Sequence, residues 1–268
     1  MATPTITRSE ERLRPRYART GLLGLGLITA TMAVFTVLVI VRFPEEAGFI
    51  VPMFVVAGIA TGIVWRFDTT WARVVGAVAT VALAVMLFWV AFGLMYPSSF
   101  FDFVPAVMFV TGVVLSLFGN IAAIVQRRRQ HLDAHAGPSE RHLEQVAVGL
   151  VVLAVLVSGV LTFVGRSSVD EAAAADAVPV DMDNFEFVPA AIEAGAGQQL
   201  LVHNSDPFMH DIAVPELGIE AMAVAPGSDV LVDVGTETGT FVVYCTLHSD
   251  VSDPSPDGDQ MVASLTVR

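Results

Sequence analysis

The sequence contains no lysine and only one cysteine, Cys245, so all 14 of its basic residues are arginine. A lone cysteine cannot form an intramolecular disulfide, which excludes a small secreted scaffold held together by disulfides. A free thiol outside the cell is open to oxidation unless something masks it, and ligation by a metal is one such mask. Burial as an inert core residue is the other interpretation of Cys245.

Charged residues are also scarce, at 15%, while 54% of the residues are hydrophobic and the mean hydropathy is +0.67. This composition is too apolar for an ordinary soluble protein. The few charges are unevenly distributed. Residues 1–168 hold 13 arginines and 9 acidic residues, whereas residues 169–268 hold one arginine and 18 acidic residues. The sequence therefore predicts two physically different domains joined end to end.

Five stretches without a charged residue predict transmembrane helices, because each is about long enough to cross a bilayer. The first is too long for the apolar region of a signal peptide, and no small-x-small cleavage site follows it. None of the five contains a histidine, which argues against a haem held by two histidines within the bundle. The predicted spans are 21–41, 47–65, 74–101, 103–126 and 145–165.

Arginine placement predicts the orientation, because cytoplasmic segments carry an excess of arginine and lysine. With a cytoplasmic N-terminus, 11 of the 14 arginines lie in cytoplasmic segments. We therefore expect a cytoplasmic segment (1–20), a five-helix transmembrane domain (21–165), a tether (166–179) and an extracytoplasmic domain (180–268). A fully extended tether of this length reaches on the order of 50 Å.

Beyond Val178 the pattern changes to short β-rich runs separated by glycine, proline and aspartate. Such spacing is typical of a small β-sandwich, and loops at one end of a sandwich are where rigid strands can hold a site. The runs that we interpret as strands are 186–188, 199–204, 212–214, 230–234, 240–245 and 264–267.

Four side chains in this region form the strongest chemical signal. Cys245 ends an apolar run three residues before His248, His210 lies upstream at a turn, and Met261 opens the last run. A thiolate, two imidazoles and a thioether are the ligand set of a blue-copper site. Each histidine alone is more simply an ordinary loop residue, but the combination predicts copper. We expect His203, on a strand, to face the surface and not to be a ligand.

Residues 178–268 resemble the cupredoxins, most closely the small plastocyanin-like and halocyanin-like carriers. The resemblance rests on the order of Phe185-Glu186-Phe187-Val188-Pro189, Asn204 before His210, and Tyr244-Cys245-x-x-His248. It implies a small all-β Greek-key sandwich that holds one mononuclear copper ion. It also implies that His210, Cys245, His248 and Met261 are the metal ligands and that Asn204 braces the two ligand loops. The five-span region carries no such resemblance.

One departure from the family concerns the axial ligand. Plastocyanin-like sequences place the methionine a few residues after the second histidine, whereas twelve residues separate His248 from Met261 here. These residues, 249–260, have turn composition throughout, and we interpret them as an inserted loop. In an alternative register Val251 occupies the axial position and the copper is three-coordinate.

Two functional hypotheses share this site. The first is a membrane-anchored carrier of single electrons through Cu(I)/Cu(II) on the outer face of the cytoplasmic membrane, with His248 as the exit edge. The second is copper capture, storage or delivery. We expect no enzyme activity, because the six histidines include no His-x-His pair for a second copper. The expected partners are a redox protein at the membrane surface and the lipid bilayer, and no nucleic acid.

Overall fold

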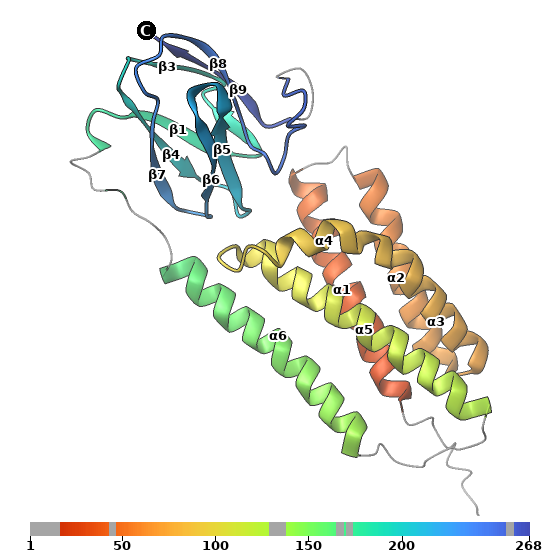
Figure 1. The fold of residues 1–268 in the computed structure, drawn as a ribbon. Coiled ribbons are helices and arrows are strands. Elements are labelled where there is room, and N and C mark those ends of the chain that lie inside the picture. The colour runs from red at the N-terminus through yellow and green to blue at the C-terminus, as the bar shows by residue number, and fades with distance from the viewer. Residues whose placement is uncertain (1–16, 43–46, 129–137, 165–168, 170–173, 256–259) are drawn as a thin grey trace, which may run out of the picture. The chain divides into compact units, whose positions relative to one another are not determined.

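The structure is a computed structural model, and it describes residues 17–42, 47–128, 138–164, 169, 174–255 and 260–268. The chain divides into two compact units, one formed by Met1–Ala91 with Pro105–Val152 and the other by Phe92–Val104 with Leu153–Arg268. Helices occupy the described residues up to Val164, and strands follow from Val178 (Figure 1).

The described part of the N-terminal region is helical, as predicted. The helices are α1 (Ala18–Arg42), α2 (Ala47–Phe67), α3 (Thr70–Leu83), the 3-10 helix η2 (Ala84–Met86), α4 (Leu87–Gly93), α5 (Phe100–Arg128) and α6 (Pro138–Val164). Four segments are long and apolar enough to cross a membrane: Ala18–Val41, Ala47–Phe67, Phe100–Arg128 and Arg141–Val164.

The third predicted span, 74–101, is not one uninterrupted α-helix. It is divided among α3, η2 and α4, with α4 ending at Gly93. No proline or glycine lies in Ala84–Met86, so nothing in the local sequence marks the change to the tighter 3-10 hydrogen-bonding pattern. The structure thus supports a helical region with four candidate spans, and the count of five stays a prediction.

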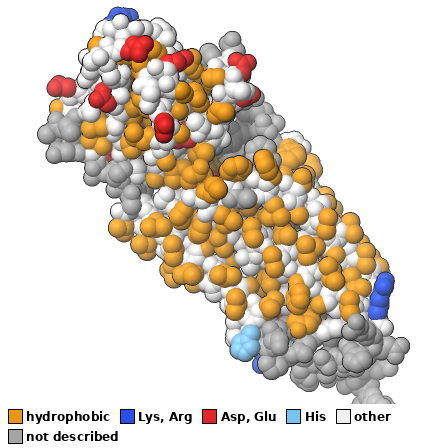
Figure 2. Space-filling view, in the orientation of Figure 1, with side chains coloured by type: hydrophobic (Ala, Val, Ile, Leu, Met, Phe, Trp, Pro, Cys, Tyr) orange, Lys and Arg blue, Asp and Glu red, His pale blue; other side chains and the backbone are white. Residues whose placement is uncertain are grey.

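Hydrophobic side chains cover the visible surface of the helical region, whereas acidic side chains gather on the β-domain (Figure 2). Trp65 in α2 is 73% exposed and Phe163 in α6 is 77% exposed. Soluble monomers rarely expose large contiguous apolar surfaces. The exposed apolar surface of the helices is therefore consistent with association with a membrane.

Glycine allows α1 and α5 to approach each other closely. A Cβ atom on Gly119 would lie 2.1 Å from the backbone nitrogen of Gly21, and one on Gly24 would lie 2.2 Å from that of Ser116. The sequence instead suggests a small-residue packing face at Gly58 and Gly62, but no atom lies within 4 Å of a Cβ atom at either position. The close approach of helices is therefore between α1 and α5 and does not involve Gly58 and Gly62 of α2.

Arg73, at the start of α3, is 2% exposed and hydrogen-bonded to several polar groups. Its guanidinium donates to the carboxylate of Asp68 at 2.6 Å, to the backbone oxygen of Ala18 at 2.7 Å and to Asn120 Oδ1 at 3.3 Å. A charge away from water is costly unless it is paired and hydrogen-bonded. The contacts satisfy this condition and connect α1, α3 and α5.

The β-domain contains nine strands among the described residues. They are β1 (Val178–Asp183), β2 (Glu186–Val188), β3 (Ala191–Ala194), β4 (Gln199–Asn204), β5 (His210–Val214), β6 (Ile219–Val224), β7 (Asp229–Asp233), β8 (Gly239–Tyr244) and β9 (Val262–Val267). All six predicted strands are present, within two residues at each end. The sequence analysis missed β1, β3 and β6.

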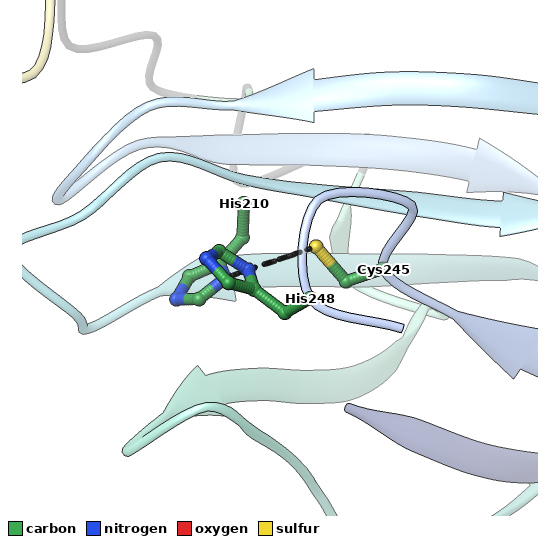
Figure 3. A group of neighbouring side chains, drawn as sticks. All are labelled: His210, Cys245 and His248. Carbon is green, nitrogen blue, oxygen red and sulfur yellow. Dashed lines mark hydrogen bonds between the residues drawn. The ribbon is translucent and has the colours of Figure 1, made fainter. Parts of the chain in front are cut away.

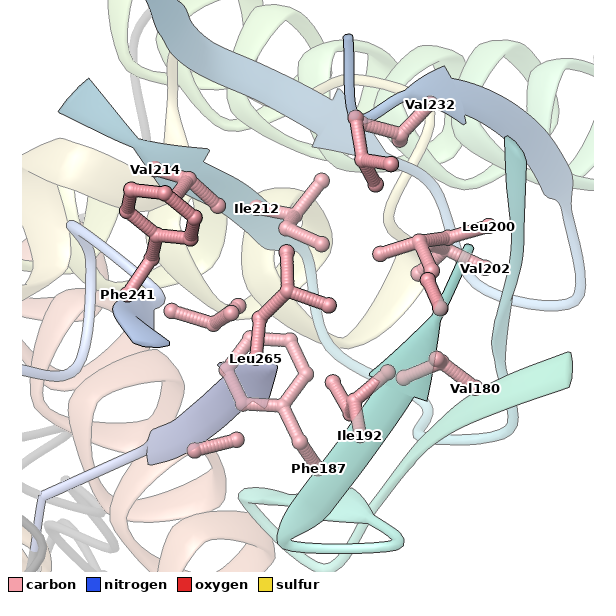
Figure 4. Packing of buried hydrophobic residues seen from close by; sticks show 14 of the residues in the cluster. Val180, Phe187, Ile192, Leu200, Val202, Ile212, Val214, Val232, Phe241 and Leu265 are labelled. Atoms are coloured by element: carbon pink, nitrogen blue, oxygen red, sulfur yellow. The ribbon is translucent and has the colours of Figure 1, made fainter. Parts of the chain in front are cut away.

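The strands form two sheets of a sandwich, in the orders β2-β1-β4-β7 and β3-β9-β8-β5-β6. β1 pairs with β4 and β3 pairs with β9 in parallel, and the other pairings are antiparallel. Between the sheets lies one hydrophobic core (Figure 4), whose side chains include Phe187, Ile192, Leu200, Ile212 and Leu265. The core holds the strand ends that carry the predicted ligands in fixed positions.

We predict that Gly119→Ala destabilises the helical region by roughly 1–3 kcal/mol, because the added methyl group meets the backbone of α1. Gly62→Ala is the matched control, since it gives the same gain in helix propensity but meets no neighbouring atom. Thermal unfolding of both variants in detergent measures the difference. Equal melting temperatures for the two variants would contradict close packing of α1 against α5.

Candidate metal centre

Strand pairing brings His210 and Cys245 together from positions 35 residues apart in the sequence. β5 begins at His210, Cys245 follows the end of β8, and these two strands are neighbours, with Ala213 opposite Tyr244. His248 lies in the turn after β8, where its backbone N–H donates to the carbonyl of Cys245 at 3.2 Å. Three of the four predicted ligands, His210, Cys245 and His248, therefore meet at one end of the sandwich.

The ligand atoms of these residues form a compact triangle (Figure 3). Nδ1 of His210 lies 3.1 Å from Nδ1 of His248, and Cys245 Sγ lies 3.4 Å from Nδ1 of His248 and 3.9 Å from Nδ1 of His210. A point equidistant from the three atoms lies about 2 Å from each, close to metal–imidazole and metal–thiolate bond lengths. The triangle therefore has the size that a metal ion requires.

The site is largely closed to water. His210 and Cys245 are both 0% exposed, and His248 is half-buried. His210 is the first residue of β5 and not a loop residue, contrary to the sequence analysis. The reason is that its backbone pairs with Val224 of β6, a strand that the sequence analysis missed. His248 does lie in a turn, although it is less exposed than predicted.

Asp211, which the sequence analysis did not single out, joins the two ligand segments. Its carboxylate accepts hydrogen bonds from the backbone N–H of Thr246 at 2.6 Å and from the Thr246 hydroxyl, and its own N–H points at Cys245 Sγ at 3.4 Å. A hydrogen bond to the sulfur is a means of tuning a blue-copper centre. The signal for Asp211 in the sequence is its position directly after His210.

The bracing role expected of Asn204 applies to one ligand segment. Its amide donates to the carbonyl of Phe208 at 2.9 Å and to that of Val224 at 2.8 Å, and its Oδ1 accepts from the N–H of Asp206. These contacts fix the loop before His210. The contacts to Thr246, on the other segment, come instead from Asp211, because its carboxylate reaches across from β5.

A second buried acid, Asp206, lies on the far side of the His210 ring, where its Oδ2 is 2.9 Å from His210 Nε2. The ring of Phe185 packs edge-to-face against His210 at 5.1 Å and against His248 at 4.5 Å between centroids. Sequence reasoning missed the roles of both residues. The spacing of four residues between Asp206 and His210 was the available signal for the first.

Burial sets the protonation of two ligands in the metal-free site. Burial, together with the neighbouring charge of Asp211, raises the pKa of the Cys245 thiol to about 12. Burial, together with the nearby His210, lowers the pKa of His248 to about 3. At neutral pH the imidazole of His248 is therefore free to bind a metal, whereas the thiol must first lose its proton.

Met261 is 1% exposed and lies in the β-domain core, while Val251 is 57% exposed. The backbone of Met261 is hydrogen-bonded to both ligand positions, since its carbonyl accepts from Cys245 N–H at 3.0 Å and its N–H donates to the carbonyl of His248 at 3.3 Å. The exposure of Val251 argues against the alternative register. Met261 as the axial ligand stays a prediction. Of the loop 249–260, residues 256–259 lie outside the described residues.

The other histidines that the structure describes do not join this group. His203 is on β4, with its side chain 43% exposed and paired with Asp229, in agreement with the surface position predicted for it. His131 and His135 lie outside the described residues. Within the described part of the chain, His210, Cys245 and His248 form the one cluster of histidine, cysteine or acidic side chains that could hold a metal ion.

Comparison with known proteins finds a family match that overlaps most of the β-domain. Residues 152–253 match a family model described as "Cupredoxin-like domain", and Met261 lies beyond the matched residues. A search of curated proteins finds no match.

Solved structures similar to this chain include an amicyanin, a purple cupredoxin and a nitrite reductase. Amicyanin from Paracoccus versutus is 18% identical, over 35% of this chain and 83% of that protein, with a TM-score of 0.29. A purple cupredoxin from Nitrosopumilus maritimus is 16% identical, over 34% and 99% of the two chains, with a TM-score of 0.26. A copper-containing nitrite reductase from Thermus scotoductus is 22% identical, over 34% of this chain and 22% of the enzyme, with a TM-score of 0.27.

We predict that metal affinity rises with pH, by about tenfold per unit between about pH 5 and 9, because the metal displaces one proton from Cys245. The raised pKa keeps the thiol protonated across this pH range. Each unit by which the pH is lowered therefore favours the proton over the metal at the sulfur of Cys245. His248, whose pKa lies below the window, adds nothing to the slope. Competition for zinc(II) with a chelator whose own protonation constants are known measures the affinity at each pH. An affinity independent of pH would show that the thiolate forms before the metal binds.

Proposed function

We propose, from the premise that the C-terminal part of this chain is a cupredoxin-like domain, that it is a membrane-anchored blue-copper protein that carries single electrons. The observation that carries this proposal is the buried triangle of His210, Cys245 and His248, whose size and donor set suit one copper ion. A bound copper ion would supply the one-electron Cu(I)/Cu(II) chemistry.

The residues around the triangle suit electron transfer because they keep the ligands in place. His210 is fixed by strand pairing and Cys245 by its backbone contact with Met261. Asp211 connects the two segments through Thr246. A site held in this way changes little between two oxidation states. We infer that no substrate is transformed, because each of the three candidate ligands is already at least half-buried and the chain has no second set of histidines for a further copper.

The helical region supports membrane anchoring through its exposed apolar side chains and its four candidate spans. We propose five spans, with α3, η2 and α4 together forming the third, since they continue without a break from Thr70 to Gly93. The N-terminus is then cytoplasmic, most arginines are cytoplasmic, and the β-domain lies on the outer face of the cytoplasmic membrane. A redox protein at that surface would exchange electrons near His248, the least buried of the four predicted ligands.

Copper capture or delivery uses the same ligands and is the alternative function. A storage protein would gain from additional thiol or imidazole ligands, whereas the described part of the chain offers a single cluster. Burial of His210 and Cys245 also slows the release of a metal, which favours a carrier of electrons over a carrier of copper.

We predict that a fragment from Asp176 to Arg268 binds one copper ion and is intensely coloured when oxidised, through charge transfer from the Cys245 thiolate. Cys245→Ser is expected to abolish the colour. Visible absorption and metal analysis over repeated cycles of oxidation and reduction provide the test. A colourless one-copper adduct of the native fragment would refute the blue-copper assignment, and loss of copper on each reduction would replace electron transfer by copper delivery.

We predict that Met261→Leu retains copper and colour but raises the reduction potential, because loss of an axial electron donor destabilises the more positive Cu(II) ion more than Cu(I). Met222→Leu is the matched control, since Met222 is on β6 and 40% exposed. Voltammetry of both variants measures the change. If Met261→Leu leaves the potential and the spectrum unchanged, Met261 is not an axial ligand.

A further inference from the structure

Asp206 is an acidic side chain buried beside the metal centre. It is 2% exposed and lies in the turn between β4 and β5, four residues before His210. Its Oδ2 lies 2.9 Å from His210 Nε2 and accepts the backbone N–H of Phe185, also at 2.9 Å. Its own N–H donates to Asn204 Oδ1 at 2.9 Å. A buried carboxylate is costly unless hydrogen bonds compensate it, so these contacts hold it in one position.

The contact with Asp206 determines which nitrogen of His210 is available to a metal. An ionised carboxylate only accepts hydrogen bonds, so Nε2 carries the hydrogen that points to Asp206. Nδ1 then keeps its lone pair, and Nδ1 is the atom that lies 3.1 Å from His248 Nδ1 and 3.9 Å from Cys245 Sγ. Metal-binding histidines usually donate their other ring N–H to such a partner, which orients the ring and raises its basicity.

The same carboxylate oxygen also holds the aromatic cover of the site. Asn184 and Phe185 form the two-residue turn between β1 and β2, with φ angles of 55° and 61°. A positive φ is uncommon for a bulky residue such as Phe185 and persists where the surroundings over-determine it. The hydrogen bond from the Phe185 N–H to Asp206 supplies such a constraint. It keeps the Phe185 ring against both histidine rings.

We propose that Asp206 is a positioning residue of the copper centre, which directs His210 Nδ1 to the metal, holds Phe185 over the two imidazoles and lowers the reduction potential of the site. This inference rests on the proposed function, since it concerns the same copper ion. A fixed negative charge next to a ligand stabilises the more positive, oxidised state of the centre. The effect is stronger here than in water, because the surroundings of a buried charge screen it less.

The test uses the full-length protein in detergent, loaded with copper, and compares Asp206→Asn with Asp229→Asn. Asparagine can still accept the hydrogen bond from His210, so the first variant removes mainly the charge. Asp229 is the matched control because its Oδ1 lies 2.6 Å from His203 Nδ1, and its side chain is 31% exposed. We expect Asp206→Asn to shift the Cu(II)/Cu(I) ratio, measured against a fixed reference couple, about tenfold toward Cu(I), which is 59 mV for one electron. Asp229→Asn should change it less than twofold.

A second measurement keeps the proposal testable if Asp206→Asn does not fold. Pulsed EPR of the native Cu(II) protein reports the remote ring nitrogens of the bound histidines, and we expect two distinct signals, since His210 Nε2 faces a buried carboxylate. Two equivalent remote nitrogens, or equal shifts for the two variants, would overturn the role of Asp206 while leaving the copper site intact. A native protein that binds no copper, or is colourless, would instead refute the proposed function.

Discussion

The pairing of β5 with β8 is the constraint on which the rest of the site depends. It places the start of one strand beside the end of the other, so that His210 and Cys245 meet across 35 residues of sequence. The carboxylate of Asp211 reinforces the pairing by accepting two hydrogen bonds from Thr246. Both ligand segments are therefore fixed before any metal binds. In such a site, little of the free energy of metal binding is lost to ordering the protein.

Three aspartates of the β-domain contact a histidine or a segment that carries a predicted ligand, and each has a different role. Asp211 connects the segments, Asp206 orients His210, and Asp229 pairs with His203 at the surface. The first two are buried and the third is partly exposed, so only the first two act at short range in a medium of low dielectric constant. The β-domain is acidic as a whole, but its influence on a metal centre comes from these two positions.

The two regions of the chain satisfy opposite requirements. The helices expose large apolar side chains and bury some of their polar groups, as Arg73 shows through its contacts with Asp68 and Asn120. The β-domain keeps its apolar side chains between two sheets and exposes most of its described acids, apart from buried ones such as Asp206 and Asp211. One chain thereby combines a helical region whose surface is suited to lipid with a β-domain suited to water, and each region has its own core.

The sequence by itself determined the kinds of side chain at the metal centre and the order in which they occur. It also determined the division into an apolar, arginine-bearing region and an acidic β-rich region, because composition and periodicity are local properties.

Tertiary structure decided what depends on distant partners. Strand β3, with the sequence Ala-Ile-Glu-Ala, has weak strand propensity and forms through its parallel pairing with β9. Asp206 and Asp211 were invisible as site residues, because an aspartate in a turn or on a strand is ordinary until the fold buries it against a histidine or a cysteine. A close approach of two helices likewise occurs at Gly24 and Gly119, whereas a Cβ atom at Gly58 or Gly62 would meet nothing, since a glycine pattern marks where helices can approach but not which helix faces it.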